Sequence, residues 1–149
     1  MAEAIAAARA AALMNEVPIG CVIVHEPTST IVGRGHNRRH TDHDATAHAE
    51  ILAIRAAGHH LGDWRLCECT LYVTLEPCPM CAGAIVNARI PRLVYGCDDP
   101  KAGAARTLFR LCEDRRLNHC AQVIAGVMSE ACAEVLRDFF RVQRELGKK

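Results

Sequence analysis

The sequence lacks a long apolar run, a linker-like tract and an internal repeat. No apolar stretch approaches the roughly 20 residues that cross a membrane, so we expect no membrane association. No Pro/Gly/Ser-rich or low-complexity segment marks a domain boundary, and the 50% of hydrophobic residues can supply a core. We therefore expect one domain covering residues 1–149.

A secretion signal is also missing. The Ala-rich segment 1–14 contains Glu3 and has no basic n-region, which predicts a helix rather than a signal peptide. The nine cysteines are an odd number in a chain that is not small, which argues against a disulfide framework. A reducing, cytoplasmic location fits better, with most thiols acting as small hydrophobes or surface groups.

Periodicity and turn residues predict strands that alternate with helices. The expected strands are 19–25, 31–36, 70–75, 92–96 and 121–126. The expected helices are 2–15, one from about residue 47, 78–87, a short piece at 107–113, and 129–146. An initial hairpin followed by this alternation indicates an α/β domain around one mixed, five-stranded sheet.

Two helices carry more detailed expectations. In the helix from about residue 47, Ala47, Ile51, Ile54 and Gly58 follow helical spacing and define its apolar face. Ser129 is the expected N-cap of the last helix. The inward-facing residues expected in that helix are Cys132, Leu136, Phe139 and Leu146.

Two short motifs carry the chemistry: His48-Ala49-Glu50 and Pro77-Cys78-Pro79-Met80-Cys81. A structural zinc site uses four protein ligands, whereas a catalytic site uses three and leaves the fourth position for water. One His and two Cys, with a Glu close by, therefore predict a hydrolytic zinc centre with its own proton carrier.

The spacing of these residues suggests where the metal lies. Both motifs fall at predicted helix starts, where the helix dipole favours thiolates. In mid-helix, residues i and i+2 point about 200° apart, so His48 and Glu50 converge only on a target beyond the helix end. We expect Zn²⁺ between two helix N-termini, held by His48, Cys78 and Cys81, with hydroxide as nucleophile and Glu50 as the proton shuttle.

Other interpretations of these residues are open. C-x-x-C alone is common, and it could be a redox pair or half of a structural zinc site completed by Cys67 or Cys69. The histidines outside the motif are expected to be surface or loop residues: His25, His36, His40, His43, His59, His60 and His119.

Taken together, the motifs resemble the H-x-E and P-C-x-x-C signature of the zinc-dependent cytidine-deaminase superfamily. More narrowly, the chain is similar to the bacterial tRNA-specific adenosine deaminases almost from end to end. The supporting stretches are 16–20, 35–38, 45–51, 70–84, 99–104, 117–119 and 138–141. The turn at 26–30 departs from the family pattern by being longer.

The resemblance implies a three-layer α/β/α, cytidine-deaminase-like domain with one Zn²⁺ per subunit. It implies hydrolytic conversion of adenosine to inosine at the wobble position of a tRNA anticodon, by a homodimer that binds the anticodon stem-loop. Asn37 matches a family residue that contacts the flipped base, and the backbone beside Ala49 and Cys78 is expected to line the pocket.

Charge adds two hypotheses, although the net charge of +1 does not itself indicate a nucleic-acid binder. The last helix carries a basic stripe, which is either a solvated face or, as the resemblance favours, a contact for the anticodon stem. Its members are Arg137, Arg141, Arg144 and Lys148, with Lys149 adding to the local excess. Asp98 and Asp99 are either a turn cap or acceptors for a ribose 2′-OH.

Two competing functions use the same residues. A deaminase of a free base such as guanine or cytosine could share the zinc chemistry. A non-catalytic zinc or RNA-binding module would instead hold a fully protein-ligated metal and release no ammonia.

Overall fold

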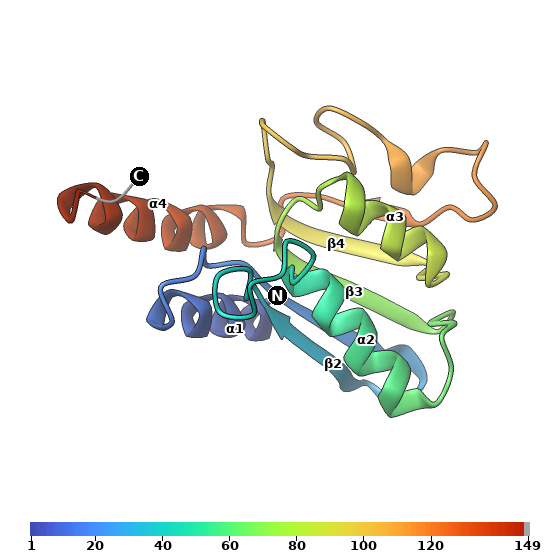
Figure 1. The fold of residues 1–149 in the computed structure, drawn as a ribbon. Coiled ribbons are helices and arrows are strands. Elements are labelled where there is room, and N and C mark those ends of the chain that lie inside the picture. The colour runs from blue at the N-terminus through green and yellow to red at the C-terminus, as the bar shows by residue number, and fades with distance from the viewer. Residues whose placement is uncertain (148–149) are drawn as a thin grey trace.

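A five-stranded mixed sheet forms the centre of residues 1–147, which are the part of the chain described by the computed structural model (Figure 1). Its strands are β1 (Gly20–His25), β2 (Thr30–His36), β3 (Cys69–Leu75), β4 (Arg92–Cys97) and β5 (Gln122–Ile124). The order is β2-β1-β3-β4-β5; β1 runs antiparallel to β2 and β3, whereas β3, β4 and β5 are parallel. The predicted mixed sheet is confirmed, although its last strand has three residues rather than the expected six.

Helices cover both faces of this sheet. They are α1 (Ala2–Leu13), α2 (Ala49–Leu61), α3 (Pro79–Asn87) and α4 (Ser129–Glu145), with short 3-10 turns η1 (Glu26–Thr28) and η2 (Leu111–Glu113). Helices α2 and α3 lie side by side on one face, and α1 and α4 lie on the other (Figure 1). This confirms the three-layer α/β/α arrangement.

The packing of α2 on the sheet explains which of its residues are buried. A Cβ atom on Gly35 of β2 would lie 2.2 Å from the carbonyl oxygen of Ala49, so the helix backbone rests directly on the strand backbone. The inward face is therefore made of small residues, Ala49, Ala53 and Ala57, all fully buried. The expected face is only partly right. Ile54 packs against the core, but Ile51 and Gly58 are partly exposed, and Ala47 is buried but precedes the helix.

The expected helix at 107–113 is largely absent. Leu108 and Phe109 donate backbone hydrogen bonds to Gly103, and Leu111 donates to Ala104, so these N–H groups are not available for a regular helix. Only η2 remains of it. This irregular segment passes close to the predicted metal-binding motif.

Helix α4 differs from expectation at both ends. Its N-cap is Met128 in the left-handed conformation at φ 55°, without a side-chain cap, and Ser129 is already helical. Towards its C-terminus the helix extends beyond the sheet (Figure 1), which is why Leu146 is exposed instead of inward-facing. Cys132 is buried as expected. Within residues 1–147, no helix combines the length and the apolarity that crossing a membrane requires.

Candidate metal centre

His48 and Cys78 occupy equivalent positions at the starts of two neighbouring helices. His48 is the N-cap of α2 and Cys78 is the N-cap of α3, both with extended backbone. Cys81 follows one turn into α3, after Pro79, whose fixed φ suits the first helical turn. The prediction that both motifs lie at helix N-termini is confirmed.

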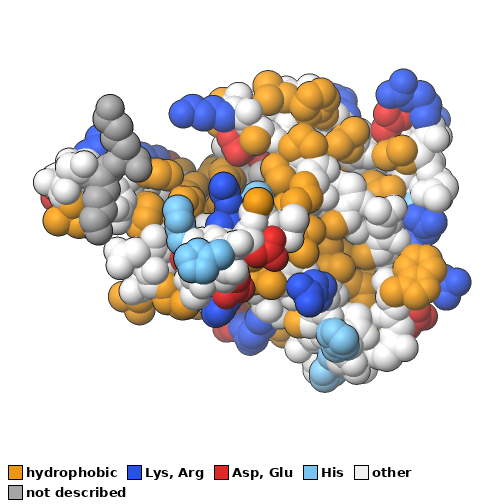
Figure 2. Space-filling model, in the orientation of Figure 1, with side chains coloured by type: hydrophobic (Ala, Val, Ile, Leu, Met, Phe, Trp, Pro, Cys, Tyr) orange, Lys and Arg blue, Asp and Glu red, His pale blue; other side chains and the backbone are white. Residues whose placement is uncertain are grey.

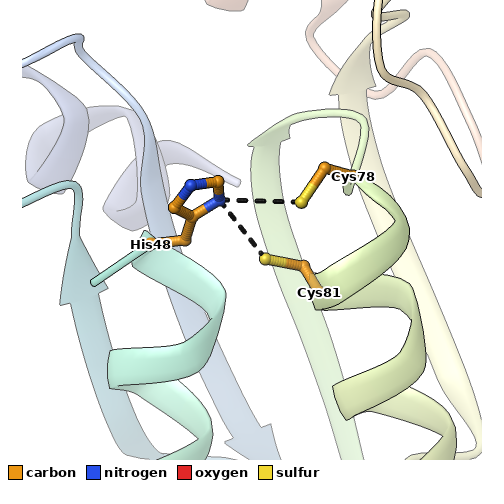
Figure 3. Close-up of side chains that lie close together, drawn as sticks. All are labelled: His48, Cys78 and Cys81. Carbon is orange, nitrogen blue, oxygen red and sulfur yellow. Dashed lines mark hydrogen bonds between the residues drawn. The ribbon is translucent and has the colours of Figure 1, made fainter. Parts of the chain in front are cut away.

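The three side chains converge on one point between the helices (Figure 3). The Nδ1 atom of His48 lies 3.7 Å from the sulfur of Cys78 and 3.5 Å from the sulfur of Cys81. All three ligand atoms lie within 4.8 Å of one another. Cys67 and Cys69 do not join this group in the described part of the chain, so neither completes a four-ligand structural site.

These positions fit a tetrahedral zinc ion. Bonds of about 2.0 Å to nitrogen and about 2.3 Å to sulfur, at tetrahedral angles, separate the two atoms by about 3.5 Å. Thiolate and imidazole are also the donors that zinc favours. Three protein ligands leave the fourth position for a reacting molecule.

Electrostatics favours a thiolate at Cys78. A hydrogen bond from Cys81, with a second from His48, lowers the pKa of the Cys78 thiol to about 4 despite its partial burial. The same bond, in which Cys81 donates, raises the pKa of the buried Cys81 thiol. The bond to Cys78 likewise raises the pKa of His48. The hydrogen bonds therefore favour a thiolate at Cys78, at the point where a cation would bind.

Glu50 lies beside this cluster but outside the group of three. It sits in the first turn of α2, is only 4% exposed and neighbours the Cys81 thiol. Burial raises the pKa of its carboxyl group to about 7. A carboxyl group with that pKa can both accept and donate a proton near neutral pH, which suits a proton carrier.

Asn37 lies at the end of β2, held by a residue that sequence reasoning missed. Its side chain is 3% exposed, and its Nδ2 donates to Oε2 of Glu16 over 3.2 Å. Glu16 is fully buried and also accepts from the backbone N–H and the hydroxyl of Thr41, at 2.6 and 2.8 Å. The backbone N–H of Arg38 donates to Ala47, which closes the loop between Asn37 and His48.

The acidic pair after β4 serves local structure. Asp98 accepts a hydrogen bond from the hydroxyl of Tyr95 at 2.8 Å. Oδ1 of Asp99 accepts from the backbone N–H groups of Lys101 and Ala102, as in a capped turn. The turn-cap interpretation thus has direct support, while the second oxygen of Asp99 makes none of these bonds.

The basic stripe of α4 borders a surface groove of ≈ 560 Å³. The groove is lined by Lys101, Leu136, Arg137, Asp138, Phe140, Arg141 and Arg144. Arg137 pairs with Glu130, and Arg141 pairs with Asp138 at 3.0 Å. Lys148 and Lys149 lie outside the described residues.

Comparison with known proteins places the chain among deaminases. Residues 1–144 match the family model described as MafB19-like deaminase. The tRNA-specific adenosine deaminase of Bacillus subtilis is 50% identical over 149 residues, covering 100% of this chain and 89% of that protein. The tRNA-specific adenosine deaminase of Streptococcus pyogenes serotype M18 is 47% identical, covering 99% and 92%.

Solved structures are similar as well. One comes from studies of A-to-I editing by tRNA:A34 deaminases at the wobble position; it has a TM-score of 0.84 and 45% identity, covering 89% of this chain and 95% of that chain. A guanine deaminase from Nitrosomonas europaea has a TM-score of 0.78 over 93% of this chain and 81% of its own. At 22% identity, that second likeness concerns the fold alone.

Proposed function

The chain belongs to the MafB19-like deaminase family and to the tRNA-specific adenosine deaminases, and we propose that it converts adenosine to inosine at the wobble position of a tRNA anticodon. The reaction hydrolyses the C–N bond of a cyclic amidine: adenosine and water give inosine and ammonia. The observation that carries the proposal is the convergence of His48, Cys78 and Cys81 next to a buried carboxyl group.

We propose Zn²⁺ as the cofactor, one per subunit, held by Nδ1 of His48 and the sulfurs of Cys78 and Cys81. When bound, zinc lowers the pKa of water towards about 7 and so supplies hydroxide at neutral pH. Two thiolates and a neutral imidazole balance the charge of the ion. A fourth anionic protein ligand is then not needed, which leaves Glu50 free.

Glu50 is the proposed proton shuttle. Its carboxylate takes the proton that the attacking water gives up and delivers it to a ring nitrogen of adenine. It then takes the remaining proton from the oxygen that has added to the ring carbon and passes it to the amino group, so that the carbonyl forms as ammonia leaves. Burial supports both steps, because it brings the pKa of this carboxyl group to about 7.

The RNA contacts surround this centre. The target base must leave the anticodon loop to reach a buried site. We propose that Asn37 contacts the base, beside the backbone at Ala49 and Cys78. We propose that Lys101 and the exposed arginines of α4, which line one groove, contact the phosphates of the anticodon stem-loop.

We also propose a cytoplasmic homodimer. The dimer follows from the family, and the surface gives it some physical support. Hydrophobic side chains gather on the face that α2 and α3 present in Figure 2. Leu108 and Phe109, in the segment between β4 and η2, are each about half exposed. Light scattering coupled to size-exclusion chromatography tests this, and a monomeric mass would contradict it.

A substrate panel tests the proposed reaction. Purified protein with measured zinc content is offered an adenosine-containing anticodon hairpin, guanine, cytosine and cytidine, and ammonia and inosine are quantified. We expect inosine from the hairpin. Rapid turnover of free guanine without hairpin deamination would contradict the proposal.

Two substitutions separate an enzyme from a zinc or RNA-binding module. Glu50→Ala should keep zinc and lose turnover by about 10²- to 10⁴-fold, because it removes the proton carrier. Cys78→Ala should lose zinc together with turnover. If Glu50→Ala retains full turnover, the proton-shuttle assignment is wrong.

A further inference from the structure

Glu76 is a buried carboxylate that the proposed chemistry does not use. It follows the last residue of β3 and precedes Cys78 by two residues. Its side chain is only 2% exposed. A carboxylate in such a position must be compensated by hydrogen bonds or charge, because an isolated buried charge is costly.

The compensation comes from one segment, residues 98–107. Oε1 of Glu76 accepts from the backbone N–H groups of Ala105, Arg106 and Thr107 at 3.2, 2.7 and 2.8 Å. Oε2 accepts from the backbone N–H of Asp99 at 3.0 Å and from the hydroxyl of Thr107. Five donors from 23 to 31 residues away therefore surround one side chain.

The 98–107 segment folds tightly around this carboxylate. A Cβ atom on Gly103 would lie 2.2 Å from Oε2 of Glu76, so a larger residue does not fit there. Ala104 donates its N–H to the carbonyl of Pro77 at 2.8 Å. The segment is thus fixed at both the side chain of Glu76 and the backbone that leads into Cys78.

The same segment faces the proposed RNA-binding groove. Its Lys101 lines the groove together with Arg137, Arg141 and Arg144 of α4. Glu76 accepts a hydrogen bond from the backbone N–H of Asp99, and Lys101 follows Asp99 by two residues. The position of Lys101 in the groove therefore depends on Glu76.

We propose that Glu76 is a positioning residue that holds the 98–107 segment in the conformation that binds RNA beside the metal centre. The inference rests on the proposed function, since the RNA is the substrate named there. Glu76 acts through the segment: its two oxygens are already occupied by protein donors.

Glu76→Gln is the central test. The glutamine side chain has the same size, but an NH₂ group replaces one of the two accepting oxygens. This group cannot accept hydrogen bonds from the N–H groups that face it. Losing hydrogen bonds to a charged acceptor should raise KM for the hairpin, and Kd for the inosine-containing product hairpin, by about tenfold or more. We expect kcat and zinc content to change much less.

Hydrogen exchange gives a readout that is independent of activity. The amides of Ala105, Arg106 and Thr107 should be protected in the zinc-loaded protein and exchange faster in Glu76→Gln. Thr107→Val is a milder variant that removes only the hydroxyl donor, with an expected rise in KM of about threefold. Glu113→Gln, an exposed carboxylate in η2, is the matched control and should behave like the parent protein.

Two results would overturn the proposal. One is unchanged KM, Kd and amide protection in Glu76→Gln. The other is loss of zinc with an unchanged Kd for the product hairpin and unchanged amide protection, which would assign Glu76 to the metal site. Failure of the proposed function has a different signature. In that case the parent protein itself does not deaminate the hairpin.

Discussion

Buried carboxylates other than Glu50 organise the loops around the candidate metal centre. Glu16 connects the end of α1 to Asn37 and to Thr41, whose loop leads into His48. Glu76 does the same for the segment on the Cys78 side. Each loop is thus held by the side chain of one buried carboxylate in addition to its backbone hydrogen bonds.

Replacing Glu16 with Gln should affect both stability and substrate binding. The new NH₂ group competes with the donors of Asn37 and Thr41, and a buried unsatisfied polar group costs about 1–3 kcal/mol. Urea unfolding should therefore show a loss of about that size, and KM for the hairpin should rise because Asn37 is no longer held. Glu3→Gln, which breaks only an exposed pair with Arg34, is the control, with an expected change below about 0.5 kcal/mol. Equal stability of the two variants would contradict this role.

We expect His36 to make the folded protein less stable at acidic pH. Burial is the main effect that lowers the pKa of His36, and the nearby charge of Arg38 lowers it further. The carboxylates of Glu16 and Asp42 raise this pKa, but by less. The Nε2 atom of His36 is buried without a hydrogen-bond partner among residues 1–147. Because the folded pKa lies below that of the unfolded chain, about 6.5, the unfolded state binds protons more readily. Stability is then full above that pH and falls as the pH drops below it.

The comparison of His36→Asn with the parent protein checks this. Urea unfolding at pH 7.5 and 5.5 should show a smaller pH-dependent loss in the variant, because the titrating group has been removed. His59→Asn, at the exposed end of α2, is the control. The same loss in all three proteins would rule out His36 as the cause.

At the scale of the elements, α4 is the helix whose charge is expected to matter for RNA. Arg137 and Arg141 are paired with acidic neighbours on the same helix, which reduces the charge they offer. Arg144 lines the groove without such a pair among the described residues. We therefore expect Arg144 to contribute more to phosphate binding than Arg137.

Charge reversal tests this ranking. Arg141→Glu with Arg144→Glu should weaken hairpin binding and lower the slope of log K against log salt by about one per lost phosphate contact. Zinc content should stay unchanged, since α4 carries none of the proposed ligands. Arg137→Glu is the internal comparison, with a smaller expected effect. Unchanged affinity of the double variant at moderate salt would show that the stripe is a solvated face.

The elements also show what sequence could and could not predict. The helix starts at His48 and Cys78 were predictable, because the motif spacing and the local turn residues determine them. The inward face of α2 was not, because Gly35 on a separate strand decides how closely the helix approaches. The roles of Glu16 and Glu76 were missed for a similar reason. Their hydrogen-bond donors lie at least 21 residues away, and most donors to Glu76 are backbone N–H groups, which leave no mark in the local sequence.

For the whole molecule, the proposed metal joins two separately anchored helices. His48 belongs to α2, and both cysteines belong to α3, so zinc adds a cross-link between them. A ligand at 1,000 times its Kd stabilises the folded state by about 4 kcal/mol, which corresponds to roughly 10 °C in Tm at this chain length.

Removal of zinc with a chelator should therefore lower Tm by roughly 10 °C and abolish deamination, and adding Zn²⁺ back should restore both. Calorimetry with parallel metal analysis makes the measurement. Cys78→Ala is the matched variant, whose Tm should respond little to added zinc. If the protein loses its metal without any change in Tm, zinc does not stabilise the fold by joining α2 and α3.

The contact between Gly35 and Ala49 has a consequence for motion. Where peptide backbone rests on peptide backbone, no side-chain torsion lies between the two elements, so rotamer exchange in the core does not change their spacing. Ala49 directly follows His48. The distance of His48 from the sheet is therefore fixed by the contact between the two backbones. The proposed ligand that must meet two sulfurs from another helix therefore lies next to a direct contact between two backbones, which leaves it little freedom to move.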